Sequence, residues 1–240
     1  MPRPITYPYE NMIKIDFSDN DNELHSFVFS QQAKPYAAID TLFSALLPFG
    51  QPFILSAGEK LYFDAEQGYR IALLEEGISS YCRSSDHMYI TSGFAPSVMG
   101  LVDCYGKTYD VTTRPEHYLI AETECHGRAV LLSDFIRIAD ECDLWHDVAR
   151  FLAYRLMVMC ARDRELVGVD SYLKVRALLI EVWAYPEAYR ESINVLTFIQ
   201  RRTGTSRSRV LKILSELKKG EYIQIDNGRL VGLKKLPVAY

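Results

Sequence analysis

The chain of 240 residues lacks any long hydrophobic run. No apolar stretch approaches the roughly 18–20 residues that a membrane-spanning helix requires, and the segment 1–6 has no signal-peptide core. We therefore expect a soluble, cytoplasmic protein with no membrane partner. At 48% hydrophobic residues, the sequence still fills the cores of one large or two ordinary domains.

Cysteine and histidine are both scarce, with five residues of each. The cysteines are odd in number and evenly scattered, which argues against a disulfide framework. Cys142 and His146 have the spacing of half a metal site on one helical face, but no second pair completes it. We expect no metal, no cofactor and no catalytic residue.

Cys125 is the candidate redox-sensing thiol. His126 and Arg128 follow it closely, and cationic neighbours favour a thiolate if they point toward the sulfur. The alternative is that Cys125 is an inert, buried thiol.

Charge is unevenly distributed along the chain. From Gly168 onward there are 13 Lys and Arg residues against 7 Asp and Glu, a net charge of +6, whereas the preceding part has 14 against 24, a net charge of −10. DNA attracts a basic C-terminal module and repels an acidic N-terminal one, so this asymmetry would orient the molecule on a duplex.

The segment from Ile193 to Leu233 predicts a winged helix-turn-helix. A first helix buries Val195, Leu196, Phe198 and Ile199, and Gly204 supplies the tight turn after it. A second helix runs from the N-cap Ser206 to Gly220, and its buried stripe is Val210, Ile213, Leu214 and Leu217. Asn227-Gly228 then joins two short strands in a hairpin.

Basic and polar side chains gather on the outward face of the second helix. The predicted DNA-contacting residues are Ser206, Arg207, Ser208, Arg209 and Lys212, together with Arg229 in the hairpin. Such side chains at the start of a helix in the major groove bind bases and phosphates. The alternative is a protein-interaction winged helix with a solvated basic face.

Between Gly50 and Leu132 the pattern changes to short strands separated by turns, which predicts a jelly-roll or barrel. The expected strands are residues 52–56, 60–63, 68–74, 78–82, 87–91, 98–102, 109–113, 117–121 and 129–132. The fold class is therefore α+β. The domains are expected at 1–132 (an N-terminal segment and the barrel), 133–167 (connecting and dimerisation helices) and 168–240 (the winged helix-turn-helix).

Helical periodicity frames the barrel on both sides. Residues 35–47 predict an amphipathic helix, Ser133 is expected to cap a short one, and residues 144–166 predict a single long helix. The long helix is the expected dimerisation element, because its apolar residues exceed what one face can bury. Its stripe contains Val148, Leu152, Leu156 and Met159. The alternative is that this stripe packs on the protein's own barrel.

The order of barrel, long helix and winged helix resembles the bacterial cyclic-AMP receptor and fumarate-nitrate regulator family over residues 50–240. The turn Gly204-Thr-Ser-Arg207 and the helix after it carry the most specific part of this resemblance. The stretches 93–103, 203–208 and 236–240 resemble an orphan subgroup associated with hydrogen-peroxide resistance. The resemblance implies a dimeric transcription regulator that binds double-stranded DNA at a palindromic site, with RNA polymerase as a further partner and a link to the oxidative-stress response.

By this resemblance, Arg207 takes the place of an arginine that reads guanine. The family usually has glutamate at the next position, whereas this chain has Ser208, so we expect a different target sequence. Lys212 replaces a family arginine and loses the planar fork of that side chain.

The barrel lacks the residues with which family members bind their ligands. The stretch 100–110 contains neither the Gly-Glu pair nor the Arg-Ser pair that holds a cyclic nucleotide, and Lys107 and Thr108 are expected to lie in a solvated turn. The first cysteine is Cys82, so the N-terminal cluster of the iron–sulfur members is missing. We expect a degenerate cyclic-nucleotide-binding-like barrel or one that reads another signal. The remaining alternatives are a cupin-like barrel enzyme and a protein-interaction module that retains a winged helix.

Overall fold

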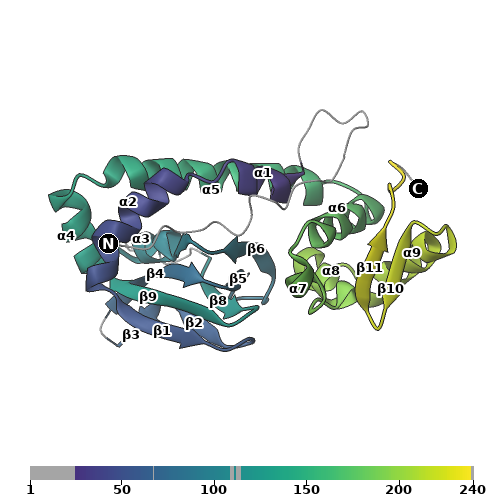
Figure 1. The fold of residues 1–240 in the computed structure, drawn as a ribbon, viewed down its shortest axis with the longest axis horizontal. Helices are drawn as coiled ribbons and strands as arrows, with labels where there is room; N and C mark the ends of the chain where they lie inside the picture. Colours follow the sequence, from purple (N-terminus) through teal and green to yellow (C-terminus); the bar gives the residue numbers. More distant parts are fainter. Residues whose placement is uncertain (1–24, 67, 109–110, 112–114, 239–240) are drawn as a thin grey trace. The chain divides into compact units, whose positions relative to one another are not determined.

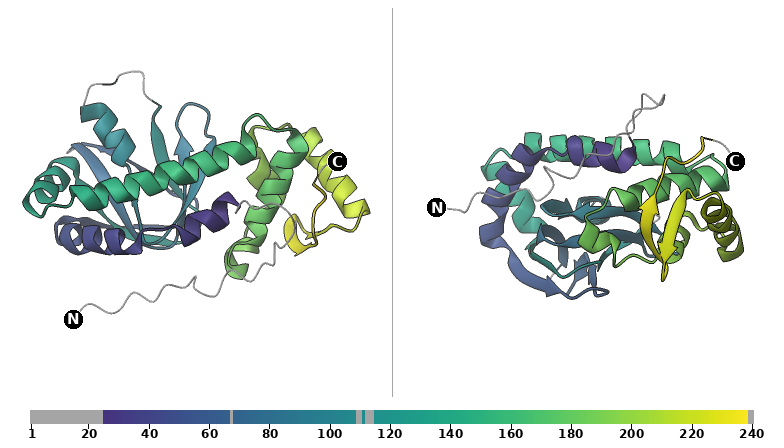
Figure 2. Two further views of the ribbon diagram at one scale, coloured as in Figure 1. Left: turned by 90° about the horizontal axis from the view of Figure 1, so that it is seen from above. Right: turned by 45° about the vertical axis from the view of Figure 1, so that its right-hand side comes forward.

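The computed structural model describes residues 25–66, 68–108, 111 and 115–238, and its chain forms two units. One unit is Pro35–Ala153. The other combines the residues up to Lys34 with those from Tyr154 onward. The long helix α5 (Trp145–Leu166), a single continuous helix in Figure 2, contributes residues to both units. Among the described residues, no helix is long and apolar enough to cross a bilayer.

Two antiparallel sheets form the jelly-roll of the first unit (Figure 1). One sheet contains β1 (Gln51–Leu55), β9 (Cys125–Leu131), β4 (Gly68–Glu76) and β3 (Asp64–Ala65) in this order, and β7 (Ser97–Met99) also pairs with β4. The other has the order β2 (Lys60–Tyr62), β8 (His117–Ala121), β5 (Ile78–Arg83) and β6 (Tyr89–Phe94). These sheets confirm the predicted α+β fold class with a jelly-roll barrel.

Strand β4 is covered by other parts of the protein on both of its faces. Ile71, Ala72, Leu73 and Leu74 are all buried although neighbouring side chains point in opposite directions, which is typical of a strand covered on both sides. Helices α3 (Leu101–Thr108) and α4 (Leu132–Glu141) pack against it, and α2 (Tyr36–Leu46) packs on α4. Figure 1 shows these three helices beside the sheets.

Four details of the first unit correct the sequence-based prediction. The expected strand 98–102 ends at Met99, because Gly100 has a φ of +94° and Leu101 begins α3. Lys107 and Thr108 therefore belong to a helix and not to a turn. Ser133 is not the N-cap of α4, since the chain enters that helix through Leu131. Strand β9 begins at Cys125, earlier than expected; the expected strand 109–113 lies almost wholly outside the described residues.

The winged helix-turn-helix follows α5 in the second unit. It consists of α6 (Ser171–Trp183), a short α7 (Glu187–Arg190), α8 (Val195–Thr203), α9 (Arg207–Lys219) and the hairpin of β10 (Ile223–Asp226) and β11 (Arg229–Leu233). Val175, Ile199 and Val210 are fully buried between its helices. The hairpin lies beside α9 (Figure 2, right).

Helix α1 (Ser26–Gln32) belongs to the winged-helix unit and not to the barrel. His25, at its start, lies 2.9 Å from the carbonyl oxygen of Ala177 in α6, and the Phe27 ring packs edge-on against Tyr185 at 4.7 Å. The sequence-based division placed residues 1–132 together, because it had no signal for a contact between positions about 150 residues apart.

The core of the winged helix contains a buried ion pair. Arg202 of α8 lies 3.1 Å from Glu181 of α6, and their side chains are only 1% and 8% exposed. Tyr185 donates a hydrogen bond to the same carboxylate, and the Arg202 guanidinium lies over the Phe198 ring. Burial acts to raise the pKa of Glu181, but the charge of Arg202 and the Tyr185 hydrogen bond outweigh it and hold the pKa below its usual value.

We predict that Glu181→Gln lowers the free energy of unfolding of this unit by about 3–5 kcal/mol, because it leaves the Arg202 charge buried without its carboxylate. The double variant Glu181→Leu with Arg202→Met should cost much less, since it removes both charges. Urea denaturation followed by Trp183 fluorescence in a Trp145→Phe background measures both. A single variant that is no less stable than the double variant would contradict this account.

Candidate nucleic-acid interface

The turn between α8 and α9 has the local chemistry of a helix-turn-helix. Gly204 ends α8 in the left-handed region at a φ of +65°, which a residue without a Cβ adopts at no steric cost. The Ser206 hydroxyl then accepts a hydrogen bond from the Arg209 N–H at 3.4 Å, as an N-cap does. Both features confirm the sequence analysis.

Helix α9 separates a buried side from a basic side. Val210, Ile213, Leu214 and Leu217 are buried. The predicted contact residues Ser206, Arg207, Ser208, Arg209 and Lys212 are all exposed, as is Leu211 at 44%. Within the described part of the chain, Arg207, Arg209 and Lys212 form no ion pair, and the positive end of the helix dipole adds to their field. The start of α9 is thus an exposed, uncompensated cationic surface.

The wing is held against the start of α8. Asn227 and Gly228 have φ values of +47° and +83°, the two positive values of a type I′ turn. The Val195 N–H donates to the Gly228 carbonyl oxygen at 2.9 Å, and a Cβ on Gly228 would lie 2.4 Å from Asn194 Nδ2. Arg229, the next residue, is exposed at the base of this turn.

Two neighbouring arginines of α8 have opposite environments. Arg202 is buried and pairs with Glu181, whereas Arg201 is exposed at the end of the helix, near the turn. The sequence analysis assigned neither of them a role. Helical spacing gave a usable signal, because Arg202 follows Val195, Phe198 and Ile199 on the buried stripe.

Helix α5 has an apolar outer face in addition to its buried one. Leu152, Leu156, Met157 and Met159, here called the outer stripe, are 39%, 64%, 50% and 51% exposed. Val148 departs from the prediction: it shares the buried face with Phe151, Tyr154 and Val158 and is only 4% exposed. Val148 lies at the edge of the predicted stripe, so a small rotation of the helix turns it inward.

A buried carboxylate occupies the part of the barrel where the sequence analysis looked for cyclic-nucleotide ligands. The Tyr81 hydroxyl donates a hydrogen bond to one oxygen of the Asp103 carboxylate in α3. The backbone N–H of His117 donates to the other oxygen, Oδ1, and His117 Nδ1 lies 3.1 Å from that same Oδ1. The Tyr81 and His117 rings stack at 4.6 Å. A negative charge here repels a cyclic phosphate, so the absence of cyclic-nucleotide binding stays our prediction.

The environment of Cys125 argues against a reactive thiol. The residue is fully buried, its sulfur lies 3.2 Å from the Ile78 carbonyl oxygen, and burial raises its pKa to about 11. The neighbours that motivated the redox hypothesis point elsewhere: His126 pairs with Glu124, and Arg128 donates to the Leu47 carbonyl oxygen. The premise that they favour a thiolate is wrong.

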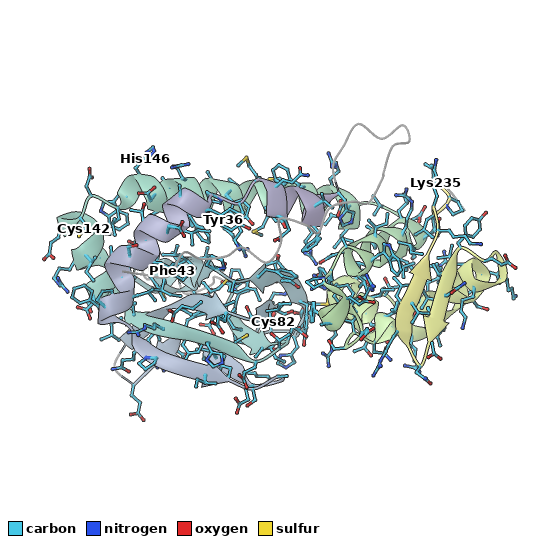
Figure 3. All side chains as sticks on the ribbon, viewed as in Figure 1. Tyr36, Phe43, Cys82, Cys142, His146 and Lys235 are labelled. Atoms are coloured by element: carbon cyan, nitrogen blue, oxygen red, sulfur yellow. The ribbon has the colours of Figure 1, made fainter. Side chains whose placement is uncertain are left out.

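The remaining candidate ligands lie apart on the surface. Cys142 and His146 are both exposed (Figure 3), and the described residues contain no group of three or more His, Cys, Asp or Glu side chains that could hold a metal ion.

Comparison with known proteins agrees with this geometry. Residues 171–238 match a family model described as winged helix-turn-helix DNA binding. The structure resembles the c-di-GMP-responsive global regulator CLP of Xanthomonas campestris at a TM-score of 0.65 and 13% identity, over 83% of this chain and 100% of that one. A putative regulator of the Crp/Fnr family from Eubacterium rectale gives a TM-score of 0.60 at 13% identity, over 85% and 95%.

Barrel, long helix and winged helix together give the chain the fold of the cyclic-AMP receptor and fumarate-nitrate regulator class, with a C-terminal winged helix-turn-helix of the DNA-binding kind. A curated relative, the inhibitor of hydrogen peroxide resistance of Escherichia coli strain K12, is 30% identical over 208 residues, which cover 86% of this chain and 98% of the relative. The chain belongs to the family of that protein.

Substitutions in α9 and in the wing should affect DNA binding in different ways. Arg207→Ala should remove about 1–3 kcal/mol of discrimination at one base pair, because we expect this exposed side chain to contact a base. Arg229→Ala should instead weaken binding to all DNA about equally and reduce the salt slope by about one, as the loss of a phosphate contact does. Titrations against specific and nonspecific duplexes at several salt concentrations test this. Equal loss of preference in both variants would show that the wrong face of α9 was chosen.

We predict that Cys125 resists thiol reagents near pH 8. With its pKa at about 11, almost none of it is thiolate at that pH, whereas the exposed Cys142 is accessible. Timed iodoacetamide labelling with mass mapping should modify Cys142 before Cys125. Early modification of Cys125, or oxidation of it by dilute peroxide, would restore the redox-sensor hypothesis.

Proposed function

We propose that the protein regulates transcription as a homodimer, whose two copies of α9 enter successive major grooves of a palindromic DNA site. The observation that carries this proposal is the uncompensated cationic start of α9, where Arg207 and Lys212 are exposed on the side opposite a well-packed core. A dimer with two-fold symmetry places its half-sites about one helical turn apart.

The outer stripe of α5 supports dimerisation. Leu152, Leu156 and Met159 recur at helical spacing on one face, and exposed apolar side chains in such an arrangement are stabilised when a second copy covers them. Because the same surface meets itself in such a dimer, every contact occurs twice.

The barrel is proposed to read a signal other than a cyclic nucleotide, or none. The Asp103 carboxylate, which accepts hydrogen bonds from Tyr81 and His117, lies in the part of the barrel where a cyclic phosphate would need cations and donors. The name of the Escherichia coli relative supports a role in the response to hydrogen peroxide. We propose that the dimer also contacts RNA polymerase, as regulators of this class do. The proposed function involves no catalytic step.

Selection of binding sites from random DNA, followed by sedimentation of the complex, tests the proposal. The selected sequences should be palindromic and should bind two chains. A monomer that binds DNA as a single copy, or a protein that enriches no sequence, would refute it.

We predict that Leu156→Asp weakens dimerisation by about a hundredfold or more. Each buried leucine is worth about 1.5–3 kcal/mol, and a symmetric interface contains two copies. Ile54→Asp is the matched control, since Ile54 is 65% exposed on β1, outside the outer stripe. Sedimentation equilibrium measures both variants; an unchanged monomer–dimer equilibrium in Leu156→Asp would place the interface elsewhere.

A further inference from the structure

The joint between α5 and α6 has little backbone structure of its own. Helix α5 ends at Leu166, and Asp170 caps the start of α6. Between them, Gly168 has a φ of +72°, and a Cβ added there would meet no atom within 4 Å. The angle between the two helices therefore depends on side-chain contacts that bridge the joint.

Two consecutive residues at the start of α1 make such a bridge. The Ser26 N–H donates to the Glu165 carboxylate at 2.6 Å, and the Ser26 hydroxyl donates to its second oxygen, so α1 is bound to the last turn of α5. The neighbouring His25 ring lies 2.9 Å from the Ala177 carbonyl oxygen and is thereby joined to α6. We call His25, Ser26 and Glu165 the joint clamp.

Further contacts extend the clamp along both helices. The Tyr154 hydroxyl donates to the Ser30 carbonyl oxygen at 2.8 Å. The C-terminal part of α1 is therefore also bonded to α5, at a position that precedes Glu165. Behind the clamp, Arg162 of α5 lies close enough to Arg202 and Glu181 for their charges to shift its pKa. Burial and the nearby Arg202 lower the pKa of Arg162 to about 10, so it remains charged at neutral pH.

The clamp connects the two surfaces on which the proposed function depends. Leu156, Met157 and Met159 of the outer stripe belong to the same unit as α9. If α5 pairs with its copy, the angle at the joint determines how far apart the two α9 helices lie. A palindrome with a fixed half-site spacing binds well only to a dimer whose two recognition helices lie at the matching distance.

We propose that His25, Ser26 and Glu165 are positioning residues that set the half-site spacing which the dimer accepts. This inference rests on the proposed function. The clamp residues do not touch DNA; they act through the orientation of α6, α8 and α9. Fixing this orientation gives the second half-site a high effective concentration only at the correct spacing.

The test uses the full chain and three DNA probes: the selected palindrome, the same palindrome with two base pairs inserted at its centre, and a single half-site. The variant is Ser26→Ala with Glu165→Ala, which removes the hydroxyl donor and both carboxylate acceptors and leaves the winged-helix core unchanged. Asp163→Ala is the matched control, because Asp163 is an exposed acid on the same turn of α5.

The wild type and the control should strongly prefer the correctly spaced palindrome over the respaced one. In the clamp variant this preference should fall by about tenfold, while half-site affinity stays unchanged. Amide hydrogen exchange in residues 163–173 should rise in the clamp variant alone. Ser26→Ala by itself, a milder change, should give a smaller loss in the same direction.

An unchanged spacing preference in a variant whose exchange has risen would overturn the inference. An equal loss of affinity for all three probes would also overturn it, because that result indicates a merely destabilised domain. If the wild type shows no preference for any palindrome, the proposed function fails and the inference fails with it.

Discussion

The buried pair of Glu181 and Arg202 is the interaction on which the DNA-binding unit depends. Glu181 comes from α6 and Arg202 from α8, so the pair fixes the helix that precedes the recognition helix. A charge this deeply buried is tolerated only when its partner and its hydrogen bonds are in place, and Tyr185 completes the set. Apolar side chains tolerate small shifts in packing. An ion pair with fixed geometry does not, so it selects one arrangement of α6 and α8.

Helix α5 satisfies two requirements with one sequence. Phe151, Tyr154 and Val158 recur at helical spacing and are buried in the protein's own core, while the outer stripe presents apolar side chains to solvent. A single chain can bury only one face of this helix, so the second apolar face stays exposed to solvent in a monomer. This exposed apolar face is the basis of the proposal that the same helix completes the core of one chain and also forms a symmetric dimer.

The barrel keeps the architecture of its class but has different chemistry in its interior. Gly100 turns the chain into α3 at a φ of +94°, close to the Phe63 ring, and this places the Asp103 carboxylate under Tyr81 and His117. A site built to bind a phosphate requires cations and donors, whereas this one presents an acceptor whose donors are already engaged. The fold alone therefore does not identify a ligand for the barrel.

The sequence by itself determined the features that depend on near neighbours. Helical spacing gave the limits of α5 and the buried side of α9, the residue types at Ser206 and Gly204 gave the turn, and Asn227-Gly228 gave the wing, because each rests on contacts within a few residues. Only the tertiary structure decided that Arg202 pairs with Glu181, that Val148 faces inward, and that His126 and Arg128 point away from Cys125. It also decided that α1 packs against α5 and α6. These outcomes depend on contacts between residues that are far apart in the sequence. Local propensity carries no information about which distant residue will make each contact.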